Sequence, residues 1–179
     1  MKKILFIFSF LLISCSEDLS QKAKDFSQNK IIIDSHIDTP FQIWRQKNNT
    51  GASDDITKST SFHFDYPRAV EGGLNLPFFA IFIPARTEPE GTSFDLAVEL
   101  INMMNEIISN NPDKFTFIKN PSDISILEQD KNLVGIAYGI ENGAPIEGKL
   151  ENIKFFCLLW FVRMLFLLFV CVCVCFSFD

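Results

Sequence analysis

Two short acidic segments contain the residue types that bind divalent metal ions. The first is residues 34–38 (DSHID), which follow the β-branched run Ile31–Ile33. If a strand continues through this segment, its alternation places His36 and Asp38 on one face. An imidazole and a carboxylate together suit zinc or manganese, and three ligands of this kind do not distinguish the two metals. His-x-Asp alone is a weak pattern, because Asp38 equally suits the cap of the turn that follows.

Glu141 ends a second apolar run, residues 133–140, and is followed by Asn142 and Gly143. An acid in this place is either a ligand at the carboxyl end of a strand or a solvated turn residue. His63, the other histidine, lies in a polar loop, and we assign it no catalytic function. The chain shows no convincing Ser-His or Cys-His arrangement, so no catalytic residue is assigned.

Strand and helix signals alternate through the middle of the chain. Residues 31–33 read as a strand buried on both faces, residues 74–83 as a strand whose ordered core begins after Pro77, and residues 133–140 as a third strand. A helix is predicted from Thr92 and Ser93 to Asn110, and a shorter one from Pro121 to Leu127, whereas residues 45–61 read as loop. Strands separated by helices predict a right-handed parallel α/β arrangement.

The charge balance excludes one class of partner. The chain has 22 acidic and 16 basic residues and a net charge of −6, so no nucleic-acid partner is expected, since affinity for phosphates requires clustered Lys and Arg. No glycine-rich phosphate-binding loop is present in the sequence. The chain has 179 residues, whereas a closed eight-stranded α/β barrel needs about 200 or more.

The amino terminus predicts export. Residues 1–14 combine a charged start with a short apolar run, as in a lipoprotein signal peptide, and Cys15 would then carry the lipid. Residues 15–30 are expected to form a polar tether, which would hold the protein on the periplasmic or cell-surface side of a membrane. The alternative is an ordinary signal peptide without lipidation.

The carboxyl terminus, residues 155–179, is apolar, with Arg163 as its one charge before Asp179. It is long enough for a transmembrane helix, in which Arg163 would reach the interface, and it would then contact the membrane. The run CVCVC at residues 171–175 can also be encoded by a simple dinucleotide tract, which favours a frameshifted, read-through or truncated end. A cleaved anchor signal is the least favoured alternative, because it belongs to a different export system.

Residues 34–40 resemble the opening motif of the membrane (renal) dipeptidase family. The resemblance covers about Lys30 to Phe156 and continues in order through five further segments: residues 65–68 (DYPR), 71–73 (EGG), 78–84, 111–112 (NP) and 139–143 (GIENG). Ordered matches over this length are more specific than any one motif. Asn142 stands where the family frequently has glycine, and Ala144 where histidine is common.

The resemblance implies a TIM-type (β/α)8 barrel with two zinc ions that hydrolyses dipeptides. His36 and Asp38 would hold the first metal and Glu141 would bridge both, and the metals would activate a shared water. The family's later histidine pair, which completes the second metal, has no counterpart in this chain. The fold expected for residues 31–154 is therefore an α/β fragment of about three βα units, with apolar segments at both termini.

Two functions remain open from the sequence. The first is a metallodipeptidase by descent, which keeps only a partial zinc site and is expected to be poorly folded and inactive as written, with the third strand's edge exposed. The second is a non-enzymatic, membrane-tethered module derived from the same barrel. The sequence does not indicate substrate preference or oligomeric state.

Overall fold

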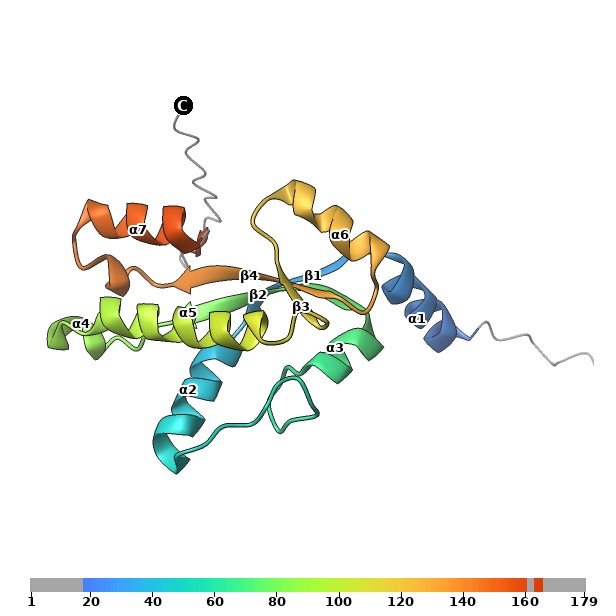
Figure 1. Cartoon of the computed structure of the whole chain (residues 1–179), viewed down its shortest axis with the longest axis horizontal. Coiled ribbons are helices and arrows are strands. Elements are labelled where there is room, and N and C mark those ends of the chain that lie inside the picture. The colour runs from blue at the N-terminus through green and yellow to red at the C-terminus, as the bar shows by residue number, and fades with distance from the viewer. Residues whose placement is uncertain (1–17, 161–162, 166–179) are drawn as a thin grey trace, which may run out of the picture.

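Helices alternate with the strands of one parallel sheet in the computed structural model, which describes residues 18–160 and 163–165 (Figure 1). The strands run in the order β1-β2-β4-β3, and β5 also pairs with β4. All described strand pairs are parallel, as predicted. The strands are β1 (Ile32–Ile37), β2 (Leu74–Phe82), β3 (Phe115–Phe117), β4 (Val134–Glu141) and β5 (Arg163–Leu165).

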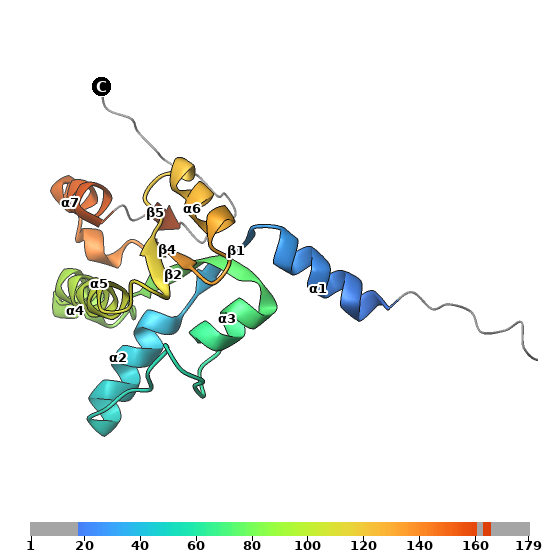
Figure 2. The same ribbon diagram turned by 45° about the vertical axis from the view of Figure 1, so that its right-hand side comes forward.

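Helices α5 and α7 lie side by side, and α6 lies across the sheet from α2 and α3 (Figures 1 and 2). The helices are α1 (Leu19–Asn29), α2 (Thr39–Thr50), α3 (Tyr66–Gly72), α4 (Thr87–Glu90), α5 (Ser93–Ser109), α6 (Ile124–Gln129) and α7 (Leu150–Trp160). Two short 3-10 helices, η2 (Pro121–Asp123) and η3 (Ala144–Ile146), precede α6 and α7.

The core lies between β2, β4 and α5. Alternate residues of β2, among them Phe79 and Ile81, face α5, whose Leu100 and Met104 are fully buried. The apolar residues of α5 recur every three or four positions, so one face of the helix is buried along its length. The predicted helix from Ser93 to Asn110 and the predicted strand at residues 133–140 are confirmed within one residue.

The loop predicted for residues 45–61 is wrong at its start, because residues 45–50 are helical. Helix α2 continues to Thr50 and ends at Gly51, whose φ of 82° gives the left-handed conformation that glycine accepts readily. Pro40 lies in the first turn, where its missing N–H costs nothing. The polar sequence after Arg45 misled the prediction because only one face of this helix contacts the core.

The prediction that β1 is buried on both faces is wrong. Its three middle residues, Ile33 to Ser35, are exposed and the other three are half-buried, and Ile33 is 50% exposed. The reason is topological, because within the described residues β1 pairs with β2 alone.

Strand β2 also differs from the prediction, since Pro77 lies inside it and is paired with Asp34 next to an irregularity in the pairing of the two strands.

Strand β4 has partners on both edges, contrary to the expected exposed edge. Val134–Ile136 pair with β3, which the sequence did not predict, and Gly139–Glu141 pair with β5. Gly135 permits the close packing of the loop and helix that follow β3. A Cβ on Gly135 would lie 2.5 Å from the Ile118 side chain and 2.8 Å from that of Leu127.

The range expected to be a polar tether contains a helix, α1. Its N-cap is Asp18, and its residues are mostly exposed, but its last turn docks on the turn between α3 and β2. The Gln28 amide donates to the carbonyls of Val70 and Glu71 at 3.2 and 3.0 Å. Residues 1–14 and Cys15 lie outside the described part of the chain.

Helix α7 crosses the boundary at which the apolar tail was expected to begin. Phe156 is fully buried, and its ring lies 5.3 Å from that of Phe94 at the start of α5. This part of the tail therefore belongs to the core. Among the described residues, no helix has the length and apolar character that a membrane crossing requires.

Asp65 anchors the long loop between α2 and α3. Its fully buried carboxylate accepts hydrogen bonds from the Thr60 and Arg68 amides, both at 3.0 Å, and from Arg68 Nε at 2.8 Å. Burial raises the pKa of this carboxyl, but the hydrogen bonds from Arg68 and Thr60 outweigh it and hold the pKa below its ordinary value.

We expect Asp65→Ala to lower the free energy of unfolding by about 2–3 kcal/mol at pH 7, because it removes a helix cap and leaves buried donors unpaired. Because the folded pKa is depressed, this stabilisation is present above the ordinary pKa and is lost as the pH falls through the folded value. Urea unfolding at pH 7 and pH 3 measures both effects. Asp113→Ala, which removes an exposed ion pair with Lys114, serves as the control, and an equal loss in both variants would contradict the assignment.

Candidate metal site

The predicted residues His36, Asp38 and Glu141 lie together at the carboxyl edge of the sheet. His36 belongs to the end of β1, Asp38 directly precedes α2, and Glu141 is the last residue of β4. Strand β2 lies between β1 and β4, so its end separates the two contributing strands. The carboxyl edge is where parallel α/β folds place their functional residues.

A bulge in β1 orients His36. Asp34 pairs with Pro77 and Ile37 with Phe79, so three steps along β1 match two along β2. The Asp34 carboxylate accepts a hydrogen bond from the His36 amide at 2.9 Å, which holds the bulge. Simple strand alternation predicted the right face for His36 and Asp38, but the strand is irregular there. A bulge commonly re-aims a side chain beside a functional site, and the sequence did not indicate this role of Asp34.

The three side chains offer ligand atoms that converge. His36 Nε2 lies 3.3 Å from Asp38 Oδ1 and 3.2 Å from Glu141 Oε2, and one ligand atom from each residue lies within 4.8 Å of the others. The Asp38 side chain is 53% exposed, that of His36 30% and that of Glu141 21%, so the site opens to solvent on the Asp38 side.

Glu141 Oε2 is buried and, although it lies 3.2 Å from His36 Nε2, makes no hydrogen bond of good geometry. Burial raises the pKa of the Glu141 carboxyl, His36 lowers it and Asp38 raises it, and the net shift is upward. Without a cation, the ionised form of this carboxyl is therefore disfavoured. A cation beside it would supply the missing partner and favour the ionised form.

The donor set fits a divalent metal ion. Two ligand atoms that each lie about 2.1 Å from a tetrahedral ion are separated by about 3.4 Å, close to the observed 3.2 and 3.3 Å. One imidazole nitrogen and two carboxylate oxygens suit zinc or manganese. Three protein ligands also leave coordination positions for water or substrate, as in catalytic sites.

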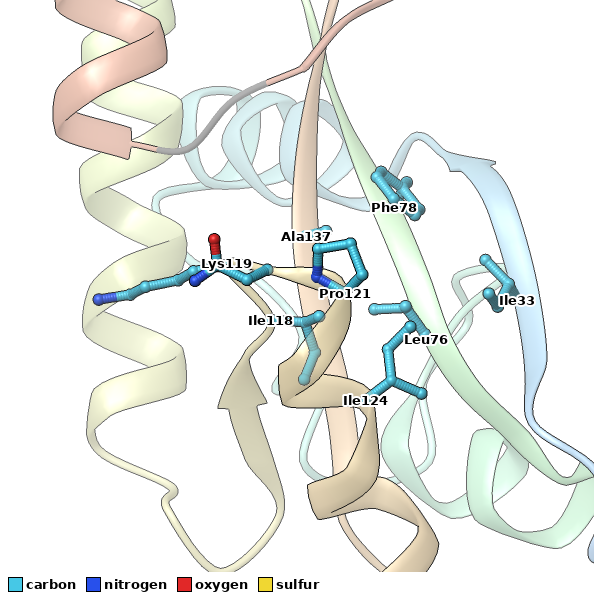
Figure 3. Close-up of a pocket in the computed structure, with 9 residues that line it drawn as sticks. Ile33, Leu76, Phe78, Ile118, Lys119, Pro121, Ile124 and Ala137 are labelled. Carbon is cyan, nitrogen blue, oxygen red and sulfur yellow. The ribbon is translucent and has the colours of Figure 1, made fainter. Parts of the chain in front are cut away.

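Other candidate features lie apart from this site. His63 is exposed in the loop between α2 and α3 and is not part of the metal-ligand group. An apolar cavity of about 220 Å³ lies along the beginning and middle of the strands, lined by Ile33, Leu76 and Ala137 together with Ile118 and Pro121 (Figure 3). It contains none of the three predicted ligands. Ala144, where the resemblance favours histidine, is buried at the start of η3.

The fold and the site define a class: a parallel α/β protein with a metal-ligand group at the carboxyl edge of its sheet. A family model described as Membrane dipeptidase (Peptidase family M19) matches residues 20–175. The chain therefore belongs to the membrane dipeptidase family. The match extends beyond residues 30–156, the limits of the resemblance in the sequence, and includes all of α1 but its first residue and part of the apolar tail.

Solved structures show the same fold. A metallopeptidase from Rhodobacter sphaeroides, liganded with a phosphinate mimic of the dipeptide L-Ala-D-Ala, matches with a TM-score of 0.62 and 18% identity over 76% of this chain and 45% of that one. The probable dipeptidase PvdM from Pseudomonas aeruginosa gives 0.64 and 20% over 80% and 36%, and the metallopeptidase called dipeptidase AC gives 0.59 and 19% over 74% and 42%. This chain thus spans less than half of each structure and forms part of a TIM-type barrel.

Proposed function

We propose that this chain is the amino-terminal part of a metal-dependent dipeptidase. His36, Asp38 and Glu141 would hold one zinc ion, and Glu141 would also contact a second. The observation that carries the proposal is Glu141 Oε2, which is buried without a hydrogen bond and lies 3.2 Å from His36 Nε2. A buried carboxylate oxygen without a donor is costly, and a metal ion offsets that cost.

The chemistry proposed is hydrolysis of a dipeptide. A bound metal lowers the pKa of water towards neutrality and polarises a carbonyl. The chain's own residues have positioning roles: Asp34 fixes the backbone of His36, and the end of β4 presents Glu141 to the same point. The dipeptide mimic bound to the Rhodobacter sphaeroides relative supports this substrate class.

The chain alone is proposed to be inactive. It supplies three ligands, whereas the resemblance implies a second metal with a histidine pair, and further substrate-binding residues, that have no counterpart in this sequence. The remaining histidine, His63, is exposed and outside the group. Metal binding without turnover is the behaviour that this set of residues supports.

Binding of Mn²⁺ by the purified full chain tests the site. Mn²⁺ prefers oxygen and imidazole ligands, so the five cysteines compete for it less than they would for zinc. We expect about one Mn²⁺ per chain by electron paramagnetic resonance, and a loss of binding of at least about tenfold in His36→Ala. His63→Ala is the matched control and should bind as the unchanged chain does. Equal binding in both variants would reject the site.

Hydrolysis of L-Ala-D-Ala, measured with the same material, should not exceed that of metal alone. Metal-dependent hydrolysis that His36→Ala abolishes would contradict the proposed inactivity.

Sequencing the gene from the codon for Gly148 past that for Asp179, with translation of all frames, tests the dipeptidase origin independently. A shifted frame that supplies the two missing histidines would support it.

A further inference from the structure

The residue after Glu141 has a backbone conformation that is unusual for a side-chain-bearing residue. Asn142 has a φ of 66°, and only one other non-glycine residue in the described part of the chain, Glu147, has a positive φ. Asparagine accepts the left-handed region more readily than most residues, because its short amide can bond locally. The chain therefore turns out of the sheet directly after the ligand.

The Asn142 side chain uses both ends of its amide to hold this turn. Its Nδ2 donates to the carbonyl of Ile83 at 2.5 Å, and its Oδ1 accepts from the Ala144 amide at 2.9 Å. Phe82 and Glu141 form the last residue pair between β2 and β4. Ile83 follows Phe82, and Asn142 follows Glu141. The Asn142 amide therefore joins the ends of β2 and β4 one position beyond their last residue pair.

The acceptor of this bond belongs to a core residue. Ile83 is fully buried in the core cluster. The backbone of Glu141 is thus held by its pairing with β2 and β5, and the residue that follows it is held by its bond to the Ile83 carbonyl. At its outer end, Glu141 Oε2 lies 3.2 Å from His36 Nε2 but makes no hydrogen bond of good geometry. The backbone therefore contributes to its position beside His36.

We infer that Asn142 is a positioning residue for Glu141, and that its bridge to Ile83 sets the affinity of the metal site. The inference rests on the proposed metal site. Without the bridge, the turn after β4 is released and the carboxylate is no longer held 3.2 Å from His36 Nε2. A ligand held by a partner of this kind commonly loses about 10–100-fold in metal affinity when the partner is removed.

Asn142→Gly tests the bridge, because glycine keeps the left-handed backbone and removes only the amide. We expect its dissociation constant for Mn²⁺ to rise about tenfold and the resonance line shape of the bound ion to change. Gly143→Ala is the control in the same turn. A Cβ there meets no atom within 4 Å and the φ of −93° is ordinary, so its binding should be unchanged.

A double-mutant cycle separates positioning from general destabilisation. In the Glu141→Gln background, Asn142→Gly should change the dissociation constant less than about twofold, because its effect passes through Glu141. Asn142→Asp, which keeps an acceptor for the Ala144 amide but cannot donate to Ile83, should also bind Mn²⁺ more weakly than the unchanged chain. This second variant covers the case in which the glycine variant does not fold.

The outcomes distinguish this inference from the proposed function. If the unchanged chain binds Mn²⁺ and both Asn142 variants bind equally well, the positioning role is rejected while the metal site stands. Additive effects in the cycle would also reject it. If the unchanged chain does not bind Mn²⁺, the proposed function fails and the inference fails with it.

Discussion

Glu141→Gln is expected to weaken Mn²⁺ binding by roughly 100-fold or more and, at the same time, to stabilise the metal-free fold. The loss should exceed that caused by removing an outer partner, because Glu141 supplies a ligand atom itself. The gain follows from the burial of Oε2 without a hydrogen bond of good geometry, since an amide avoids the burial of a charge. Opposite signs for affinity and stability are typical of a functional site.

The stability gain should depend on pH. Burial, opposed by His36 and reinforced by Asp38, raises the pKa of the Glu141 carboxyl above its ordinary value of 4.5. Below pH 4.5 the Glu141 carboxyl is protonated in both the folded and the unfolded chain. The Glu141→Gln variant then has no stability advantage. As the pH rises through the folded pKa, the unfolded chain ionises more readily and the unchanged protein is penalised.

Urea unfolding of the metal-free protein at pH 4 and pH 7.5 measures this difference. Glu151→Gln, which alters an exposed acid in the first turn of α7, is the matched control. A lower stability of Glu141→Gln at pH 7.5 would show that the carboxylate supports the fold rather than a ligand.

Phe156→Ala is expected to lower the free energy of unfolding by about 3–5 kcal/mol, the usual cost of truncating a fully buried phenylalanine. Its ring contacts those of Phe94 and Phe155 at 5.3 Å, so the truncation leaves a cavity between α5 and α7. Urea unfolding at pH 7 measures the loss. Lys154→Ala, at an exposed position of the same helix, should change stability by less than about 0.5 kcal/mol.

This result bears on the apolar carboxyl terminus. A large loss would establish that the chain as far as Phe156 packs on the domain. No difference between the two variants would mean that α7 does not pack on the core, and a separate apolar segment from residue 155 onward would then be favoured.

The elements predicted most accurately from the sequence are those with a repeating apolar pattern. The stripe of α5 and the apolar run of β4 each reflect burial against a neighbour, which the sequence records directly. Strand β3 has only three residues and no pattern long enough to read. Helix α2 presents a single buried face from Thr39 to Ile43, and its polar remainder resembled a loop.

Some features of the site could likewise be predicted from the sequence, and others could not. Residue type and position at strand ends made His36, Asp38 and Glu141 candidates, and the resemblance to the dipeptidase family favoured them as metal ligands. The bulge held by Asp34 was not predictable, because it depends on the register of β1 against β2. The bond from Asn142 to Ile83 joins residues 59 positions apart, so only the folded chain brings it into view.

The open flank of β1 has a practical consequence for any solution experiment. Within the described residues this flank has no partner strand, and its backbone groups face outward. Such an edge can pair with the same edge of a second molecule, so we expect self-association to increase with protein concentration. Metal titrations are best performed at low micromolar concentration with light scattering in parallel, so that strand pairing between molecules is not mistaken for a response to the ion.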